Sequence, residues 1–130
     1  MKSLLRYIPV LIVALAVTAF AVSAGNDPAP DSPPTETLTL FWMEGCPYCE
    51  AEWEFLGELQ TTYPNLEIVD YEVSFDEANR ALFVETLAER GLEAGPVPTT
   101  ILGEQVWVGF DTSTASGILA TVNEMMNPAS

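Results

Sequence analysis

The sequence contains no histidine and only two cysteines, Cys46 and Cys49. A structural zinc site needs four Cys or His ligands, so one chain cannot build it, although two chains could share a site completed by carboxylates. Both cysteines belong to one Cys-x-x-Cys pair, and none is left for a separate structural disulfide. The pair therefore indicates redox chemistry, with a permanently closed, inert disulfide as the alternative.

Basic residues are almost as scarce. Only Lys2, Arg6, Arg80 and Arg90 stand against 19 acidic residues, and residues 25–130 keep two of the four and all 19 acids, a net charge of −17. Nucleic acid and anionic membrane surfaces are therefore poor partners. Because the acids are spread along the whole chain, they favour a solubility surface over a specific preference for basic partners, but both interpretations stay open.

Charge is absent between Tyr7 and Ala24. Lys2 and Arg6 precede this run, and Val22-Ser23-Ala24 suits signal peptidase. Since the run is also just long enough to span a bilayer, we expect residues 1–24 to be either a signal peptide or a retained membrane anchor. Both put the rest of the chain outside the cytoplasm, in the periplasm, at the cell surface or secreted. No cysteine ends the run, which excludes a lipoprotein anchor.

Residues 25–37 hold four prolines and no large apolar side chain. Such a segment cannot form a core, so it is predicted to be a disordered, extended linker. The remaining residues, 38–130, have the length of one compact domain.

That domain opens with an apolar stretch, Leu38 to Met43, which predicts a buried strand. The Cys46-Pro47-Tyr48-Cys49 motif follows directly, and helical spacing runs from Pro47 to about Tyr63. The first cysteine would then lie where unpaired N–H groups and the helix dipole stabilise a thiolate, while Glu44 and Glu50 oppose it. The second would lie one turn further on.

In this first helix, an apolar stripe is predicted at Leu56, Leu59 and Tyr63, with Ala51 or Glu52 above them. The same helix carries four glutamates that we expect to mark its solvent side: Glu50, Glu52, Glu54 and Glu58.

Four further elements are predicted from alternation, capping residues and turns. The first two are a strand at Leu66–Ser74 and a helix at about Phe75–Arg90, which a Ser74–Glu77 capping box opens and Gly91 ends. The third is a hairpin of strands Thr99–Leu102 and Val106–Phe110 that turns at Gly103–Gln105. The fourth is a last helix, capped by Asp111 or Thr112, whose expected buried residues are Ile118, Leu119, Val122, Met125 and Met126. The βαβα start implies parallel strands.

These motifs resemble a known superfamily. Cys46-Pro47-Tyr48-Cys49 is identical to the active-site tetrapeptide of glutaredoxins, Phe41-Trp42 resembles thioredoxins and their extracytoplasmic relatives, and Val97-Pro98-Thr99 resembles the cis-proline loop that faces the two cysteines. The resemblance implies an α/β thioredoxin fold, with a central mixed four-stranded sheet in the order βαβα-ββα, flanked by helices and preceded by the N-terminal hydrophobic segment.

The resemblance also implies roles for individual residues. Cys46 would be the nucleophile and Cys49 the resolving thiol, while substrate contacts would come from Pro47, Tyr48, Val97, Pro98 and Thr99. The peptide bond before Pro98 would be cis, which leaves the Val97 backbone free to pair with an extended substrate. No bound cofactor or metal is expected, because the electrons would arrive through another dithiol protein.

Two departures from the relatives narrow this expectation. Glu44 occupies the neighbourhood in which glutaredoxins carry a basic residue for a glutathione carboxylate, and Val108–Asp111 matches their second glutathione loop only in part, so glutathione use is doubtful. Leu40 occupies the place of the buried aspartate that serves proton transfer in thioredoxins. That proton relay is therefore absent or replaced.

We thus predict a monomeric, extracytoplasmic thiol-disulfide oxidoreductase that acts on protein thiols and disulfides, with the direction of electron flow open. Two alternatives are a tethered reductase for cytochrome c maturation and a non-catalytic binding module with a closed disulfide. The short interval from Cys49 to Pro98 leaves little room for the insertion that such tethered reductases often carry, which favours the general role.

Overall fold

The computed structural model describes residues 36–128, so the predicted targeting segment 1–24 and most of the predicted linker lie outside the described residues. The elements follow one another as β1 (Glu36–Trp42), α1 (Pro47–Thr62), β2 (Leu66–Glu72), α2 (Glu77–Ala88), β3 (Thr99–Leu102), β4 (Gln105–Val108) and α3 (Thr112–Met126). Within residues 36–128, no helix is long and apolar enough to cross a membrane.

The four strands form one mixed sheet in the order β2-β1-β3-β4. Strand β1 runs parallel to β2, from Glu36 opposite Leu66 to Trp42 opposite Glu72, and antiparallel to β3. Strands β3 and β4 form an antiparallel hairpin. The predicted fold class and the parallel start are therefore confirmed.

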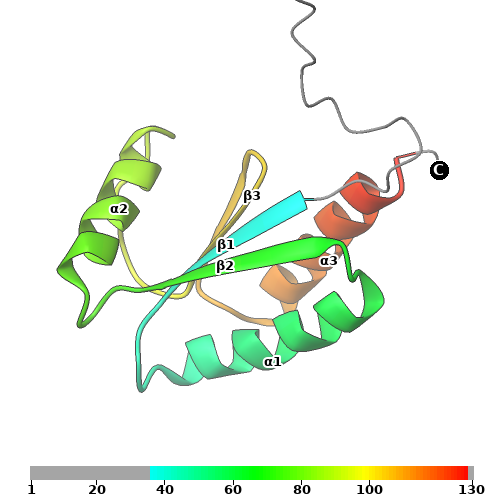
Figure 1. Ribbon diagram of the computed structural model, residues 1–130, viewed down its shortest axis with the longest axis horizontal. Coiled ribbons are helices and arrows are strands. Elements are labelled where there is room, and N and C mark those ends of the chain that lie inside the picture. The colour runs from blue at the N-terminus through cyan, green and yellow to red at the C-terminus, as the bar shows by residue number, and fades with distance from the viewer. Residues whose placement is uncertain (1–35, 129–130) are drawn as a thin grey trace, which may run out of the picture. The chain divides into compact units, whose positions relative to one another are not determined.

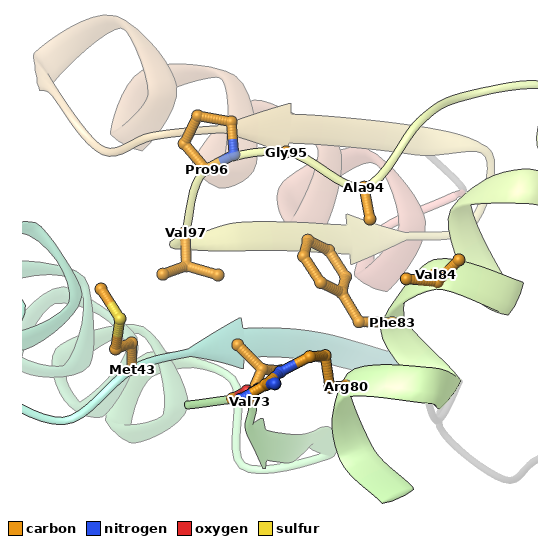
Figure 2. Close-up of a pocket in the computed structure, with 9 residues that line it drawn as sticks. All are labelled: Met43, Val73, Arg80, Phe83, Val84, Ala94, Gly95, Pro96 and Val97. Carbon is orange, nitrogen blue, oxygen red and sulfur yellow. The ribbon is translucent and has the colours of Figure 1, made fainter. Parts of the chain in front are cut away.

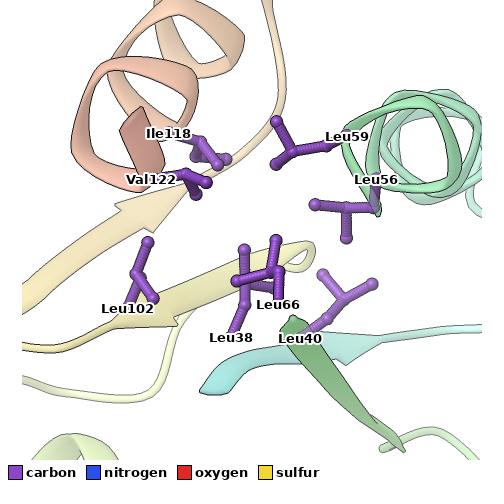
Figure 3. Packing of buried hydrophobic residues seen from close by; sticks show 8 residues of the cluster. All are labelled: Leu38, Leu40, Leu56, Leu59, Leu66, Leu102, Ile118 and Val122. Carbon is purple, nitrogen blue, oxygen red and sulfur yellow. The ribbon is translucent and has the colours of Figure 1, made fainter. Parts of the chain in front are cut away.

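Helices cover both faces of the sheet, α1 and α3 on one side and α2 on the other (Figure 1). The alternation along β1 explains this arrangement, because Leu38 and Leu40 point to one face and Phe41 to the other. Figure 3 shows the larger core, in which side chains of β1, β2 and β3 meet those of α1 and α3: Leu38, Leu40, Leu56, Leu59, Leu66, Leu102, Ile118 and Val122. A buried central strand thus delivers its carboxyl end to the cysteine motif.

Strand β1 begins two residues before residue 38, the predicted start of the domain. Glu36 and Thr37 belong to β1 and pair with Leu66 and Glu67 of β2. The prediction relied on large apolar residues, whereas backbone pairing with a parallel neighbour extends the strand beyond them. The Thr37 hydroxyl also donates to the Glu67 carboxylate at 2.9 Å.

The start of α2 was also predicted wrongly. Its cap is Asp76, whose carboxylate accepts from the Asn79 N–H at 2.9 Å, rather than Ser74. Ser74 is engaged elsewhere, since its N–H and its hydroxyl both donate to the Glu72 carboxylate. The helix ends as predicted before Gly91, which has a φ of 71°.

In α3, Ile118 and Val122 are fully buried as predicted, but Leu119 is 44% exposed. Met125 and Met126 are partly buried against the same core, whereas Leu119 is not part of it, so the apolar stripe of this helix is narrower than predicted.

Candidate active site

Cys46 occupies the capping position at the N-terminus of α1. Gly45, with a φ of 75°, turns the chain after β1, and Pro47 takes the first helical position. The Cys49 N–H donates to the Cys46 sulfur at 3.2 Å, where a serine or aspartate side chain would ordinarily cap the helix. The sulfur therefore faces a backbone N–H donor and lies at the positive end of the helix dipole.

Cys49 lies deeper in the same helix, with 1% of its surface exposed against 7% for Cys46. Burial, followed by the hydrogen bond with Cys46, raises the pKa of the Cys49 thiol to about 12. At neutral pH this thiol keeps its proton, so it can attack only after a base has removed that proton. Both cysteines are free thiols in this structure.

The loop before β3 faces the cysteines. Its Val97–Pro98 peptide bond is cis, as predicted, and the Pro98 carbonyl is fixed by the Gly109 N–H at 2.7 Å. The Val97 carbonyl accepts from the Cys46 thiol at 3.9 Å. The structure thus brings together Cys46, Cys49 and Val97, which are up to 51 residues apart in sequence.

The other predicted contact residues differ in accessibility. Pro47 and Tyr48 lie at the surface, and Tyr48, two residues after Cys46, is 65% exposed. Pro98 is buried, and its cis peptide bond defines the turn of the loop before β3. Thr99, predicted to contact the substrate, is fully buried, and its hydroxyl donates to the Pro96 carbonyl at 2.8 Å, so its side chain supports the loop instead.

Glu52 is the main surprise of the site. The sequence left it open between the top of the apolar stripe and the solvent side of α1; in the structure its side chain is fully buried and accepts a hydrogen bond from the Thr100 hydroxyl of β3. Its second oxygen, Oε2, has no hydrogen-bond partner. Burial raises the pKa of Glu52 to about 7, although the Thr100 hydrogen bond opposes this shift.

The sequence held one signal for this burial. Glu52 comes one helical turn after Cys49 and precedes Leu56 and Leu59 by four and seven residues, so it shares their apolar stripe. Three other glutamates of α1 are exposed, and residue type alone does not distinguish the buried Glu52 from them. A carboxylate from α1 therefore lies near Cys49, where its charge contributes to the raised pKa of that thiol.

Glu72, at the end of β2, is a second carboxylate that the sequence did not single out. Its oxygens accept from the N–H groups of Ser74 and Phe75, both at 2.8 Å, and from the Ser74 hydroxyl. Partial desolvation raises the pKa of Glu72, but these donors and the Glu44 N–H outweigh it and hold the pKa at about 2. The ionised carboxylate therefore ties the loop before Cys46 to the loop before α2.

Across residues 36–128, no three Cys, His, Asp or Glu side chains gather in a way that could hold a metal ion. The site consists of a capping thiol, a buried thiol, a buried carboxylate and an exposed loop backbone. This arrangement can transfer a proton and exchange one disulfide for another.

No protein-family model and no curated protein matches the sequence. Several solved structures share the fold. Thioredoxin f2 of Chlamydomonas reinhardtii is 17% identical with a TM-score of 0.53, covering 72% of this chain and 82% of its own. A Chlorobium tepidum protein assigned as thiol:disulfide interchange protein DsbE is 13% identical with a TM-score of 0.55, at the same coverages. A thioredoxin-like protein of Clostridium perfringens is 20% identical with a TM-score of 0.53, covering 73% and 74%. At these identities the similarity establishes the fold alone.

Proposed function

We propose that this domain, which has the thioredoxin fold, is an extracytoplasmic thiol-disulfide oxidoreductase that exchanges disulfides with protein thiols through Cys46 and Cys49. The observation that carries the proposal is the position of the Cys46 sulfur, 3.2 Å from the Cys49 N–H at the start of α1 and beside the Val97 carbonyl. Neither a structural disulfide nor a simple binding surface requires a sulfur in that place.

In the first step, the Cys46 thiolate attacks a disulfide of the substrate. One sulfur of the substrate becomes bonded to Cys46 in a mixed disulfide, and the other leaves as a thiolate that takes up a proton from water. The exposed edge at Val97 offers backbone groups that can pair with the substrate segment as an added strand. Tyr48 lines a hollow together with Pro96 and Val97, where its exposed ring can contact the substrate.

In the second step, Cys49 gives its proton to the Glu52 carboxylate and attacks the Cys46 sulfur. The Cys46–Cys49 disulfide forms, the second substrate thiolate leaves, and the substrate has gained the two electrons that the domain has lost. Glu52 suits this task because burial brings its pKa to about 7, near the pH at which a base must both accept and release a proton. The reverse sequence oxidises a dithiol substrate.

Two experiments test the proposal. A redox titration of the Cys46/Cys49 pair, followed by thiol labelling, should show one reversible two-electron transition. A midpoint near about −270 mV would indicate a reductase fed by a thioredoxin-like donor, including the tethered type used for cytochrome c, whereas one near about −120 mV would indicate a disulfide donor. The absence of a reversible transition would leave the non-catalytic binding module.

The second experiment separates the roles of the two thiols. Cys49→Ser should accumulate mixed disulfides through Cys46, and Cys46→Ser should accumulate none. Glu52→Gln should slow the resolution of the mixed disulfide without slowing its formation. An equal loss of both steps in the Glu52 variant would contradict the role of this carboxylate as the base.

A further inference from the structure

Helices α1 and α3 lie together on the side of the sheet opposite α2 (Figure 1), and an apolar groove lies between them. The groove consists of two adjoining hollows, of about 390 and 170 Å³, that share Leu119. This leucine is 44% exposed and lies outside the core. The hollow drawn in Figure 2 is a different one, which lies beside α2 and adjoins the active site. We call the first of these the α1–α3 groove.

The two walls of the α1–α3 groove are continuous stripes along the two helices. On α1 the wall consists of Phe55, Glu58, Leu59 and Thr62. On α3 it consists of Ser116, Leu119, Ala120 and Asn123. Both sets have the spacing i, i+3, i+4 and i+7, which aligns them over two helical turns, about 10 Å. Because Ser116 and Ala120 are small, a third helix can approach the α3 wall closely.

Contacts between α1 and the α3 region fix the groove at both ends. The Phe55 ring packs against that of Phe110, just before α3, with centroids 5.5 Å apart. Beyond the C-terminal end of α1, the Tyr63 hydroxyl donates to the Asn123 side-chain oxygen at 3.2 Å. The groove is therefore formed before any partner arrives. Its length and its two parallel stripes match one helix that presents large apolar side chains at the same spacing.

The charges on these helices favour a basic partner. Neither α1 nor α3 contains a lysine or arginine, whereas Glu58 lines the groove and Glu124 follows a lining residue. The cations within residues 36–128 are Arg80 and Arg90, in or just after α2, and both guanidinium groups donate to backbone carbonyls. A field of this sign attracts basic segments. A second copy of this chain would instead bring an equally acidic surface against the groove.

We propose that the α1–α3 groove is a docking site for a basic amphipathic helix of a partner protein. The apolar stripe of that helix covers Leu119 and Phe55, and its lysines or arginines face Glu58 and Glu124. Phe55 lies nine residues after Cys46, about 13 Å along α1, so the docked helix leaves the Cys46 sulfur uncovered. The domain thus holds a partner at one place while it reacts at another.

The test titrates the full-length protein with a fluorescent synthetic helix of about 14 residues, or four turns, built from leucine and lysine. Its leucines have the spacing i, i+3, i+4 and i+7, and binding is followed by fluorescence anisotropy. A scrambled peptide of the same composition lacks the apolar stripe, and a leucine–glutamate peptide lacks the basic charge. We expect the leucine–lysine helix to bind at least about tenfold more tightly than either control, and less tightly as the salt concentration rises.

Two pairs of matched variants locate the binding. Leu119→Asn should weaken the leucine–lysine helix about fivefold, as expected from the partial burial of one leucine, whereas Val84→Asn, at a similarly exposed position on α2, should leave its affinity unchanged. Glu58→Gln should weaken binding about twofold and reduce its salt dependence, and Glu85→Gln, exposed on α2, should do neither.

Equal affinities for the ordered and scrambled peptides, or equal losses in Leu119→Asn and Val84→Asn, would overturn the docking site, since net charge alone would then explain the binding. Tighter binding of the leucine–glutamate peptide would overturn the basic partner. A dimer of the protein alone that Leu119→Asn dissociates would assign the groove to a second copy instead. A saturating leucine–lysine helix should not change the rate at which Cys46 attacks a small chromogenic disulfide, and inhibition would place the peptide at the active site.

Discussion

The burial of Glu52 makes a prediction about stability that is independent of any substrate. Glu52→Gln keeps the shape of the side chain and its acceptor for the Thr100 hydroxyl, but it removes the ability to ionise. The folded-state pKa of Glu52, about 7, lies above the ordinary value of 4.5. The wild-type carboxyl therefore contributes its full stability below about pH 4.5, and that contribution is lost as the pH rises through about 7.

The magnitude follows from the displacement of this pKa. Each tenfold difference in proton affinity between folded and unfolded chains corresponds to about 1.4 kcal/mol, so the ionised Glu52 destabilises the folded domain by about 3 kcal/mol above pH 8. Such a loss is a large share of the stability of a domain of this size, about 5–15 kcal/mol. We thus expect the unfolding free energy of Glu52→Gln, relative to that of the wild type, to increase by about 3 kcal/mol between pH 4 and pH 8.

The assay is urea unfolding of the reduced protein at intervals from pH 4 to pH 8.5, with the free energy of unfolding extrapolated to water. The informative quantity is how the difference in unfolding free energy between Glu52→Gln and the wild type changes with pH, since a difference that is constant with pH reflects the packing of the amide. Glu54→Gln, on the exposed side of the same helix, controls for the loss of one charge. Parallel curves for Glu52→Gln and the wild type would refute the reasoning, because they would mean that Glu52 is hydrated.

Three further predictions concern single contacts. Gly117→Ala should destabilise the domain by about 1 kcal/mol in thermal or urea unfolding, because the added Cβ would lie 2.8 Å from Trp107 Nε1. Gly57→Ala, where nothing lies within 4 Å of the added Cβ, should stabilise α1 by about 0.5–1 kcal/mol. A gain in stability from both variants would show that the Trp107 side chain moves aside without cost. Thr100→Val should raise the pKa of Glu52 further, because it removes the hydrogen bond that opposes the shift. In urea unfolding, the pH at which the domain loses the stability contributed by neutral Glu52 should then be higher than in the wild type. Glu72→Gln should lower the urea midpoint at pH 7, and because the pKa of Glu72 is depressed to about 2, this difference should vanish as the pH falls from about 4.5 toward 2; a difference independent of pH would exclude the charge as its cause.

Much of the fold could be predicted because its signals are local. The Cys46–Cys49 spacing, Pro47 at the first helical turn and Gly91 after α2 each constrain the backbone within a few residues. Their order along the chain predicted the parallel start, while the four-stranded sheet followed from the resemblance to the thioredoxin superfamily. Local chemistry thus determined the elements and their sequence.

Two features depended on contacts that the residue patterns alone did not determine. The buried position of Glu52 is supported by Thr100 of β3, 48 residues away, whose hydroxyl donates a hydrogen bond to the Glu52 carboxylate. Ser74 fails to cap α2 because Glu72 already holds it, although its spacing to Glu77 fits a capping box. Tertiary packing decided the position of Glu52, whereas a contact only two residues away decided the role of Ser74.

The central position of β1 has a consequence for the biogenesis of the protein. Strand β1 and the cysteines come first in the described domain, but the Val97 carbonyl that accepts from the Cys46 thiol follows 51 residues later. A chain that emerges from its N-terminus onward therefore presents both thiols to its surroundings before β3 has been synthesised. During that interval the cysteines react without the selectivity of the finished site, so the oxidation state in which the domain first folds is set by the redox environment that the growing chain enters.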